Sequence, residues 1–503
     1  MSVIRVGSCL SQFACLMAGL LCLFFSTTVE AEATQPNILV ILADDLGYGD
    51  LGYTGSKEIR TPNIDDLAAG GVVMENGYVT HPYCGPSRAG LLTGRYQARF
   101  GMENNVAYSP YDPHAGLPEE ERTFASRLQA VGYTTGIIGK WHLGAAPNHH
   151  PNRRGFDYFY GFLSGGHNYF PEDVSVTRPL LTEGGKPDYM VNEGGYLPLM
   201  RNEKGATFDE YLTTALSRDA ARFVRESDSP FMLYLSYNAP HAPLEAPQDV
   251  TDQYQHIEDP ERRTYAAMVD VMDRGIGQVL EALKQSGKYE NTLIFFLSDN
   301  GGVYPESWMP NADWADNSPY RRGKVSLLEG GVHVPFVVHW PGTLPEGKRF
   351  DGLVSALDIA ATSVALAGAE VPEDKLDGVN LMPFLSDERQ GSPHKALFWR
   401  LEEDDYLWAV RTPEYKYMRQ PLPGVGKGFF DMVNDPYESE NLLGEHPQKQ
   451  EQLAELWNEW NAKNQSNVLL QAYPYMERRK AFYDALYKER VRAAKQREPY
   501  TVQ

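Results

Sequence analysis

The amino-acid sequence predicts an α/β protein. A large mixed, mostly parallel sheet is expected between layers of helices, followed by a smaller α+β region with an antiparallel sheet. Through residue 385, short apolar runs alternate with helical patterns; beyond it, short strand-like segments follow one another between turns. The early runs are continuously apolar rather than alternating, which indicates strands that are covered on both faces.

Five apolar runs predict the buried strands of the large sheet, at residues 37–43, 134–138, 231–236, 292–297 and 334–339. Helical periodicity between them predicts helices at residues 123–131, 211–226 and 265–285. The smaller region shows short strands at residues 396–400, 407–411 and 415–419 and a helix at 448–463. A charged helical pattern at residues 477–497 follows, and its basic residues are expected to form a solvated face.

The first 31 residues are typical of a secretory signal peptide. Arg5 supplies a positive charge, residues 15–25 are apolar, and Ala31 closes a cleavage-like sequence. The apolar run is shorter than the ~20 residues of a spanning helix, and no second such run follows. We therefore expect a soluble, exported protein that is periplasmic or secreted. The expected organisation is a signal peptide at 1–31, an α/β domain at 35–385, an α+β subdomain at 386–463 and a helical tail at 464–503.

Composition restricts the partners. With 42% hydrophobic residues among 503, the chain can bury a large core, and its net charge of −21 argues against nucleic acid as a partner. An anionic substrate would need a local cluster of cations, because salt screens more distant charges beyond roughly 10 Å.

Polar clusters follow four of the predicted strands. In an open α/β sheet, ligands bind outside the carboxyl ends of the strands, so these clusters are expected to meet in one crevice. Each cluster by itself is also compatible with an ordinary turn. The four clusters are Asp44-Asp45, Gly139-Lys140-Trp141-His142, Asn238-Ala239-Pro240-His241 and Asp299-Asn300-Gly301-Gly302.

Cys84 is the one cysteine outside the predicted leader, which contains Cys9, Cys15 and Cys22. A single thiol cannot form an internal disulfide. Pro86 suits the first turn of a helix, so residue 84 is expected at a helix N-terminus, where backbone N–H groups attract anions.

Residues 84–94 follow the pattern C-x-P-S-R-x4-T-G. This pattern resembles the signature of the type I sulfatases, members of the alkaline-phosphatase-like superfamily. Residues 132–142, 238–243 and 323–331 resemble further segments of the same family. Residues 83–105 are similar to exported bacterial sulfatases that act on polysaccharides. The resemblance implies a sulfuric ester hydrolase of the alkaline-phosphatase-like fold that removes sulfate from a sulfated polysaccharide or oligosaccharide.

The resemblance also implies the site residues. Cys84 would be converted to formylglycine by a maturation enzyme, and its gem-diol would attack sulfur. Arg88 would brace the site, Lys140 would contact the sulfate, and His142 would take a gem-diol proton. Either His241 or Lys324 would protonate the departing alcohol, and this choice stays open. The metal ligands implied are Asp44, Asp45, Asp299 and Asn300, whose oxygen donors favour Ca²⁺, with Mg²⁺ as the alternative.

Two other functions stay open at this point. Phosphate or phosphonate monoester hydrolysis uses the same fold, and a catalytically inactive protein that binds sulfated glycans would keep the pocket without needing the nucleophile. Several polar and aromatic residues are either sugar contacts or packing residues: His167, Asn168, Tyr169, Trp308 and Trp314. The sugar, the sulfate position, endo or exo action and the oligomeric state are not indicated by the sequence.

Overall fold

In the computed structural model of the protein, the described residues are 35–106, 108, 110, 112–173, 181–182, 186–187, 199–228, 230–305, 311–371, 376–401, 407–420 and 426–469. Three sequence predictions lie outside them: the signal peptide at 1–31, the helical pattern at 477–497 and Trp308. The described residues from Pro36 to Leu469 belong to one compact unit, and the domain boundaries drawn at 385 and 463 stay predictions.

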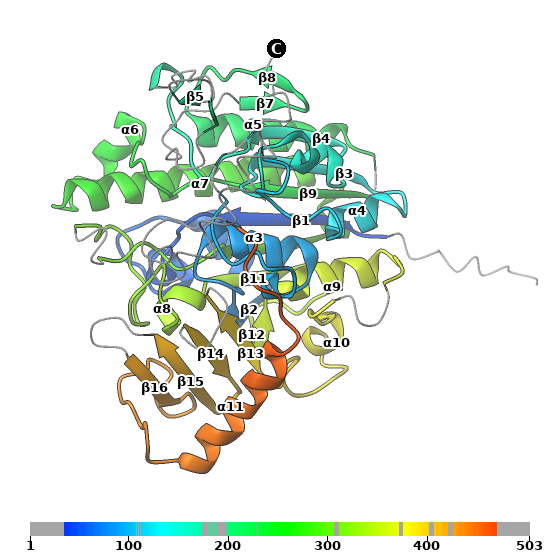
Figure 1. The fold of residues 1–503 in the computed structure, drawn as a ribbon. Helices are drawn as coiled ribbons and strands as arrows, with labels where there is room; N and C mark the ends of the chain where they lie inside the picture. Colours follow the sequence, from blue (N-terminus) through cyan, green and yellow to red (C-terminus); the bar gives the residue numbers. More distant parts are fainter. Residues whose placement is uncertain are drawn as a thin grey trace, which may run out of the picture. The chain divides into compact units, whose positions relative to one another are not determined.

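A large mixed sheet organises the chain (Figure 1). Among the described residues its order is β12-β2-β11-β10-β1-β9-β3-β4-β7-β8. The central neighbours β10, β1, β9, β3 and β4 run parallel, whereas β11 and β7 join antiparallel. These strands are β1 (Asn37–Ala43), β2 (Val72–Tyr78), β3 (Thr134–Lys140), β4 (Tyr158–Phe162), β7 (Leu199–Arg201), β8 (Lys204–Ala206), β9 (Phe231–Ser236), β10 (Thr292–Ser298), β11 (Phe336–His339) and β12 (Lys348–Ser355).

Helices cover both faces of this sheet. Alternate residues of β1 belong to two different hydrophobic clusters: Val40 packs with helices α3, α4 and α9, and Ile41 packs with α2, α5 and α7. Because side chains alternate across a strand, β1, which is apolar from Ile38 to Ala43, supplies both layers. The helices are α2 (Pro62–Ala69), α3 (Cys84–Thr93), α4 (Phe124–Gln129), α5 (Leu212–Glu226), α6 (Gln248–Thr251), α7 (Pro260–Gln285), α8 (Glu329–Val332), α9 (Leu357–Leu366) and α10 (Met382–Leu385).

A separate antiparallel sheet follows in the C-terminal part, shown in orange tones in Figure 1. It consists of β13 (Leu397–Arg400), β14 (Trp408–Arg411), β15 (Tyr415–Gln420) and β16 (Gly426–Asp431). Helix α11 (Pro447–Asn461) packs Trp457 and Trp460 against Trp408 and Phe429 of this sheet. The predicted fold class is therefore confirmed: a mixed, mostly parallel sheet between helices and a smaller antiparallel sheet. A further small pair is β5 (Leu181–Thr182) with β6 (Lys186–Pro187).

Two of the element boundaries that differ from the prediction have local causes. Helix α7 begins at Pro260, five residues before the predicted start, because the Asp259 side chain accepts the Arg262 N–H at 2.8 Å and caps the helix. Strand β3 continues through Lys140, which pairs with Phe162 of β4. The segment 139–140 therefore lies in the sheet rather than in a loop after it.

No helix among the described residues has both the length and the apolar character needed to cross a bilayer.

Candidate active site

The four polar clusters predicted at strand ends lie together. Strands β10, β1, β9 and β3 are adjacent and parallel, so their carboxyl ends share one edge of the sheet. Backbone hydrogen bonds join the exits directly: Asp44 N–H donates to Ala239 O at 3.1 Å, and Asp299 N–H donates to Ala43 O at 3.0 Å. The four polar clusters therefore lie together at this edge of the sheet, as the sequence predicts.

Cys84 lies at the first residue of α3, as its sequence context predicts. The thiol is buried, with 1% of the residue exposed, and Sγ is 3.9 Å from Asp45 Oδ1. The next residue, Gly85, donates its N–H to Asn105 Oδ1 at 2.9 Å. One candidate ligand atom from each of Asp44, Asp45, Cys84 and His241 lies within 4.8 Å of the others. The thiol thus lies beside carboxylates that could hold a cation.

Three basic side chains face three carboxylates in this site. Lys140 Nζ is 2.6 Å from Asp44 Oδ2, and Lys324 Nζ is 2.8 Å from Asp45 Oδ2. Arg88 donates from Nε to Asp299 Oδ2 at 2.8 Å. All six side chains are almost entirely buried, so water weakens these attractions little.

Both predicted histidines lie at the same edge of the sheet. His142 has a left-handed backbone with φ of 58°, and its carbonyl oxygen is 3.5 Å from where a Cβ on Gly85 would lie. His241 Nε2 is 3.6 Å from Asp45 Oδ2, and its Nδ1 is 2.6 Å from Ala242 O. The structure therefore brings together all ten residues predicted from the sequence, while their individual roles stay predictions.

Burial and neighbouring charges shift the ionisation of these groups. Burial alone would raise the pKa of Asp45, but Lys324 and then His241 outweigh it and hold the pKa below its usual value. Burial, and then the charge of Asp44, raise the pKa of Asp299 to about 6. Burial also raises the pKa of the Cys84 thiol well above its ordinary value, so an unmodified Cys84 is a neutral thiol rather than a thiolate.

The oxygen donors of the site fit a hard divalent cation. Asp44 Oδ1 and Asn300 Oδ1 are buried without a hydrogen-bond partner, although buried oxygens normally have one. Asn300 Nδ2 donates to Asp45 Oδ1 at 2.7 Å, so its own Oδ1 belongs to the same cluster. Carboxylate and amide oxygens are ligands that Ca²⁺ and Mg²⁺ prefer. A cation would give both buried oxygens a partner.

The comparisons with known proteins agree with this geometry. Residues 36–369, more than half of the chain, match the family model described as Sulfatase.

The chain belongs to the sulfatase family.

The resemblance inferred from the sequence is thereby confirmed, and the protein is a sulfatase enzyme. A second model, N-sulphoglucosamine sulphohydrolase, C-terminal, matches residues 323–466. Human steryl-sulfatase is 35% identical over 493 residues, covering 85% of this chain and 82% of that protein. Human N-acetylgalactosamine-6-sulfatase is 36% identical, covering 70% of this chain and 66% of that protein.

Solved structures show the same relationship. The crystal structure of Ps i-CgsB has a TM-score of 0.79 and 39% identity, and covers 91% of this chain and 97% of its own. The PsFucS1 sulfatase from Pseudoalteromonas sp. has a TM-score of 0.69 and 27% identity, and covers 85% of this chain and 90% of its own.

Two further residues support the predicted site: Ser236 was not recognised from the sequence, and Tyr169 was left open there as a sugar contact or a packing residue. Ser236, the last residue of β9, accepts a hydrogen bond from Arg88 Nη1 at 2.5 Å and donates to Lys140 O at 2.8 Å. Tyr169 is fully buried, and its hydroxyl lies 2.7 Å from both Asn238 O and His241 O. Tyr169 therefore holds the His241 turn, which makes it a packing residue rather than a sugar contact. Neither contact follows from a local motif.

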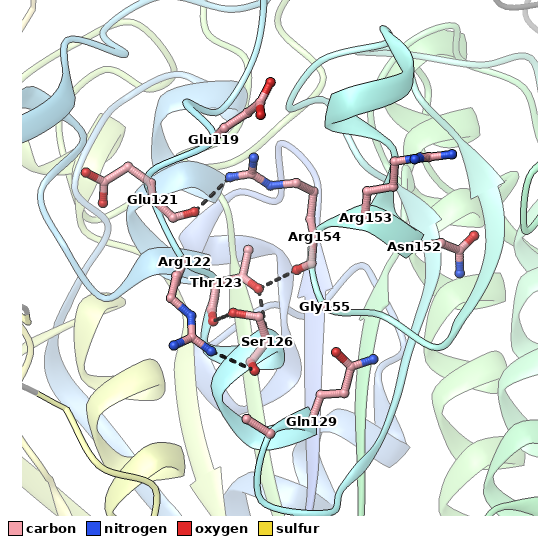
Figure 2. A pocket seen from close by; sticks show the side chains of 11 residues that line it. Glu119, Glu121, Arg122, Thr123, Ser126, Gln129, Asn152, Arg153, Arg154 and Gly155 are labelled. Atoms are coloured by element: carbon pink, nitrogen blue, oxygen red, sulfur yellow. Dashed lines mark hydrogen bonds between the residues drawn. The ribbon is translucent and has the colours of Figure 1, made fainter.

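A separate cavity of about 470 Å³ lies beside α4 (Figure 2). It contains none of the ten predicted site residues. Its basic side chains are bonded within the protein: Arg154 donates to Glu121 O at 2.7 Å, Arg122 donates to Ser126 O at 3.3 Å, and Arg153 pairs with Glu203 at 3.0 Å. This cavity therefore lies outside the site predicted from the sequence.

Proposed function

We propose that this sulfatase removes sulfate from a sulfated carbohydrate, with residue 84 as formylglycine and with a bound Ca²⁺. The observation that carries the proposal is the cluster at the N-terminus of α3. There, Cys84 lies close to carboxylate oxygens that could bind a metal ion and to the buried basic side chains of Lys140 and Lys324.

The relatives favour a carbohydrate substrate. Ps i-CgsB, 39% identical, has been solved in complex with k-i-k-neocarrahexaose, and the alignment covers 91% of this chain. Relatives named N-acetylgalactosamine-6-sulfatase also act on a sugar by name. Steryl-sulfatase, at 35% identity, marks the competing substrate class. A substrate test therefore has to include both classes.

The charge balance of the site suits an anionic ester. The carboxylates of Asp44, Asp45 and Asp299 balance the charges of Arg88, Lys140 and Lys324. A divalent cation held by Asp44, Asp45, Asp299 and Asn300 would leave a net positive site and would supply Lewis-acid stabilisation of a sulfate oxygen. The local field would then attract a sulfate group even though the whole chain carries a net charge of −21.

The positions of the other side chains in the site support the roles that we propose for them. In its formylglycine form, residue 84 would supply the oxygen that attacks sulfur, at a helix N-terminus whose N–H groups favour the anion. Lys140 would bind a sulfate oxygen, and Arg88 would hold the carboxylate of Asp299 in place. Lys324 and His241, on the Asp45 side of the site, would face the departing oxygen, where one of them donates the proton that the leaving alcohol needs. His142 would accept a proton when sulfate is released.

Two features of maturation belong to the same proposal. Residues 1–31 would direct export, and a formylglycine-generating enzyme would convert Cys84. Mass spectrometry of the peptide that contains residue 84 should show loss of the thiol and an aldehyde or its hydrate. A purified, active enzyme with an intact thiol at residue 84 would exclude formylglycine.

The central experiment is a substrate screen that measures free sulfate from the sulfate esters and free phenol from the aryl sulfate and the phosphonate ester. The substrates are defined sulfated oligosaccharides, an aryl sulfate, a steryl sulfate, and a phosphonate ester of the same phenol as the aryl sulfate. We expect turnover of at least one oligosaccharide and its loss in Cys84→Ala. Turnover of the steryl ester alone would refute the carbohydrate assignment, and faster cleavage of the phosphonate would favour the phosphonate hydrolase alternative. Binding of glycans without any turnover by the matured enzyme would indicate the inactive binding protein.

A further inference from the structure

The segment that carries Lys324 is held between the Cys84 segment and the C-terminal sheet. Val325 N–H donates to Pro82 O at 3.1 Å, two residues before Cys84. On the other side, Gln420 Nε2 donates to Val325 O at 3.0 Å, and Gln420 Oε1 accepts the Leu327 N–H at 2.6 Å. One amide side chain therefore holds the backbone on both sides of Ser326.

This backbone has a conformation that its sequence disfavours. Val325 has a φ of 79°, in the left-handed region, where a β-branched residue is an outlier. Such a conformation persists only when surrounding contacts enforce it. The hydrogen bonds to Pro82 and Gln420 act on the N–H and C=O of Val325, so they provide this enforcement.

Gln420 is well placed for such a role. It is the last residue of β15, and only 1% of it is exposed. Lys416, on the same strand, reaches the same segment at a second point, with Nζ 2.7 Å from Glu329 Oε1. The C-terminal sheet thus holds the Lys324 segment from residue 325 to residue 329.

We propose that Gln420 is a positioning residue for Lys324. It holds Val325 in the left-handed conformation, so that the Lys324 ammonium stays beside Asp45 and faces the departing oxygen of the ester. This inference rests on the role that the proposed function gives to Lys324. It extends that role to Gln420 in the separate C-terminal sheet, which is not one of the residues proposed to bind substrate or metal.

A positioning role has a signature that a purely structural role lacks. If Lys324 stabilises the charge on the departing oxygen, its misplacement should slow esters of weakly acidic alcohols most, because these develop the most charge on that oxygen. Esters of acidic phenols need little such help. A loss of folded protein, in contrast, would lower all rates by the same factor.

The test uses the full-length matured enzyme and a series of aryl sulfates whose phenols differ in pKa. Gln420→Met keeps the side-chain length and removes the hydrogen bonds of the amide with Val325 O, the Leu327 N–H and the Ser326 hydroxyl. Asn441→Leu is the matched control, because the Asn441 amide also bonds backbone groups within the C-terminal region. It accepts from Phe429 N–H at 3.0 Å and Leu443 N–H at 3.1 Å, and it donates to Lys427 O at 3.0 Å. Lys324→Ala gives the reference slope, and the melting temperature of each variant is measured in parallel.

We expect kcat of Gln420→Met to fall about 100-fold for the least acidic phenol and less than about threefold for the most acidic one, as in Lys324→Ala. Asn441→Leu should keep the wild-type slope. Gln420→Glu retains the acceptor for Leu327 and loses the donor to Val325, so it provides the same reading if Gln420→Met does not fold.

The outcomes distinguish the positioning role of Gln420 from the role of Lys324 and from the proposed function. A steeper slope in Lys324→Ala together with a wild-type slope in both Gln420 variants overturns the positioning role alone. Equal slopes in Lys324→Ala and wild type overturn the role of Lys324 and this inference with it. Failure of the wild type to cleave any sulfate ester overturns the proposed function itself.

Discussion

Lys416 offers a quantitative test of how the C-terminal sheet is joined to the rest of the protein. Its fully buried ammonium lies 2.7 Å from Glu329 Oε1 and 2.8 Å from Glu438 Oε1. Burial alone would raise the pKa of both carboxyl groups. Lys416 outweighs burial at Glu329, whose pKa is held low, whereas the pKa of Glu438 stays raised. The perturbation is Lys416→Met, which keeps the volume and removes the charge.

The expected loss of unfolding free energy in Lys416→Met follows from the contacts that Glu329 and Glu438 would keep. Glu329 would keep hydrogen bonds from the Tyr78 hydroxyl at 2.6 Å and from His333 Nδ1 at 3.0 Å, but neither carboxylate would keep a cation within 3 Å among the described residues. Removing one partner of a buried ion pair costs about 3–5 kcal/mol. We expect a loss of that size in the free energy of unfolding near pH 8. The loss should shrink toward pH 5, because a carboxyl group whose pKa is raised in the folded state binds a proton there and relieves the repulsion.

The assay is urea unfolding of wild type, Lys416→Met, Glu438→Gln and the double variant, compared by transition midpoint at equal slope. In the double variant one of the two unpaired charges is gone, so it should recover about 1–3 kcal/mol relative to Lys416→Met. A loss below about 1 kcal/mol for Lys416→Met, or strictly additive losses in the double variant, would refute the reasoning.

Three further outcomes are expected. Burial lowers the pKa of His394, but the Asp358 carboxylate, 2.8 Å from Nε2, outweighs burial and raises the pKa above its usual value. The pair therefore stabilises the fold below pH 6.5 and loses this effect as the pH rises through the raised pKa, so His394→Gln should lower the melting temperature more at pH 6 than at pH 9. Removal of divalent ions with EDTA should lower the melting temperature, restored by Ca²⁺, and Asp44→Asn should reduce this difference; an identical response in wild type and variant would argue against Asp44 as a ligand. Gly139→Ala should cost at least about 3 kcal/mol in unfolding free energy, because its φ is 108° and a Cβ would lie 1.9 Å from Ser236 O; a fold as stable as wild type would contradict that clash.

Local sequence patterns predicted the fold class and the candidate residues of the active site. The uninterrupted apolar run at Asn37–Ala43 predicts a strand covered on both faces, and its alternate residues do belong to the two opposite cores. The cluster at Cys84 was recognisable because its motif lies within eleven residues, where a single helix, α3, sets the relative positions. The carboxyl ends of adjacent parallel strands share one edge of the sheet. The prediction that Asp44, Lys140, His241 and Asp299 lie close together therefore rested on the apolar runs that these residues follow.

The contacts that position the side chains of the site are not contained in any local sequence pattern. Ser236 reaches Lys140 across 96 residues, and Gln420 reaches Leu327 across 93. Ser and Gln have no spacing or periodicity that marks such a partner, and a single hydrogen bond changes neither hydropathy nor helical pattern. The sequence by itself determined which residues are expected to meet an anion and what kind of sheet carries them. The tertiary structure alone decided what holds them there, because that depends on which distant backbone groups packing leaves within hydrogen-bond reach.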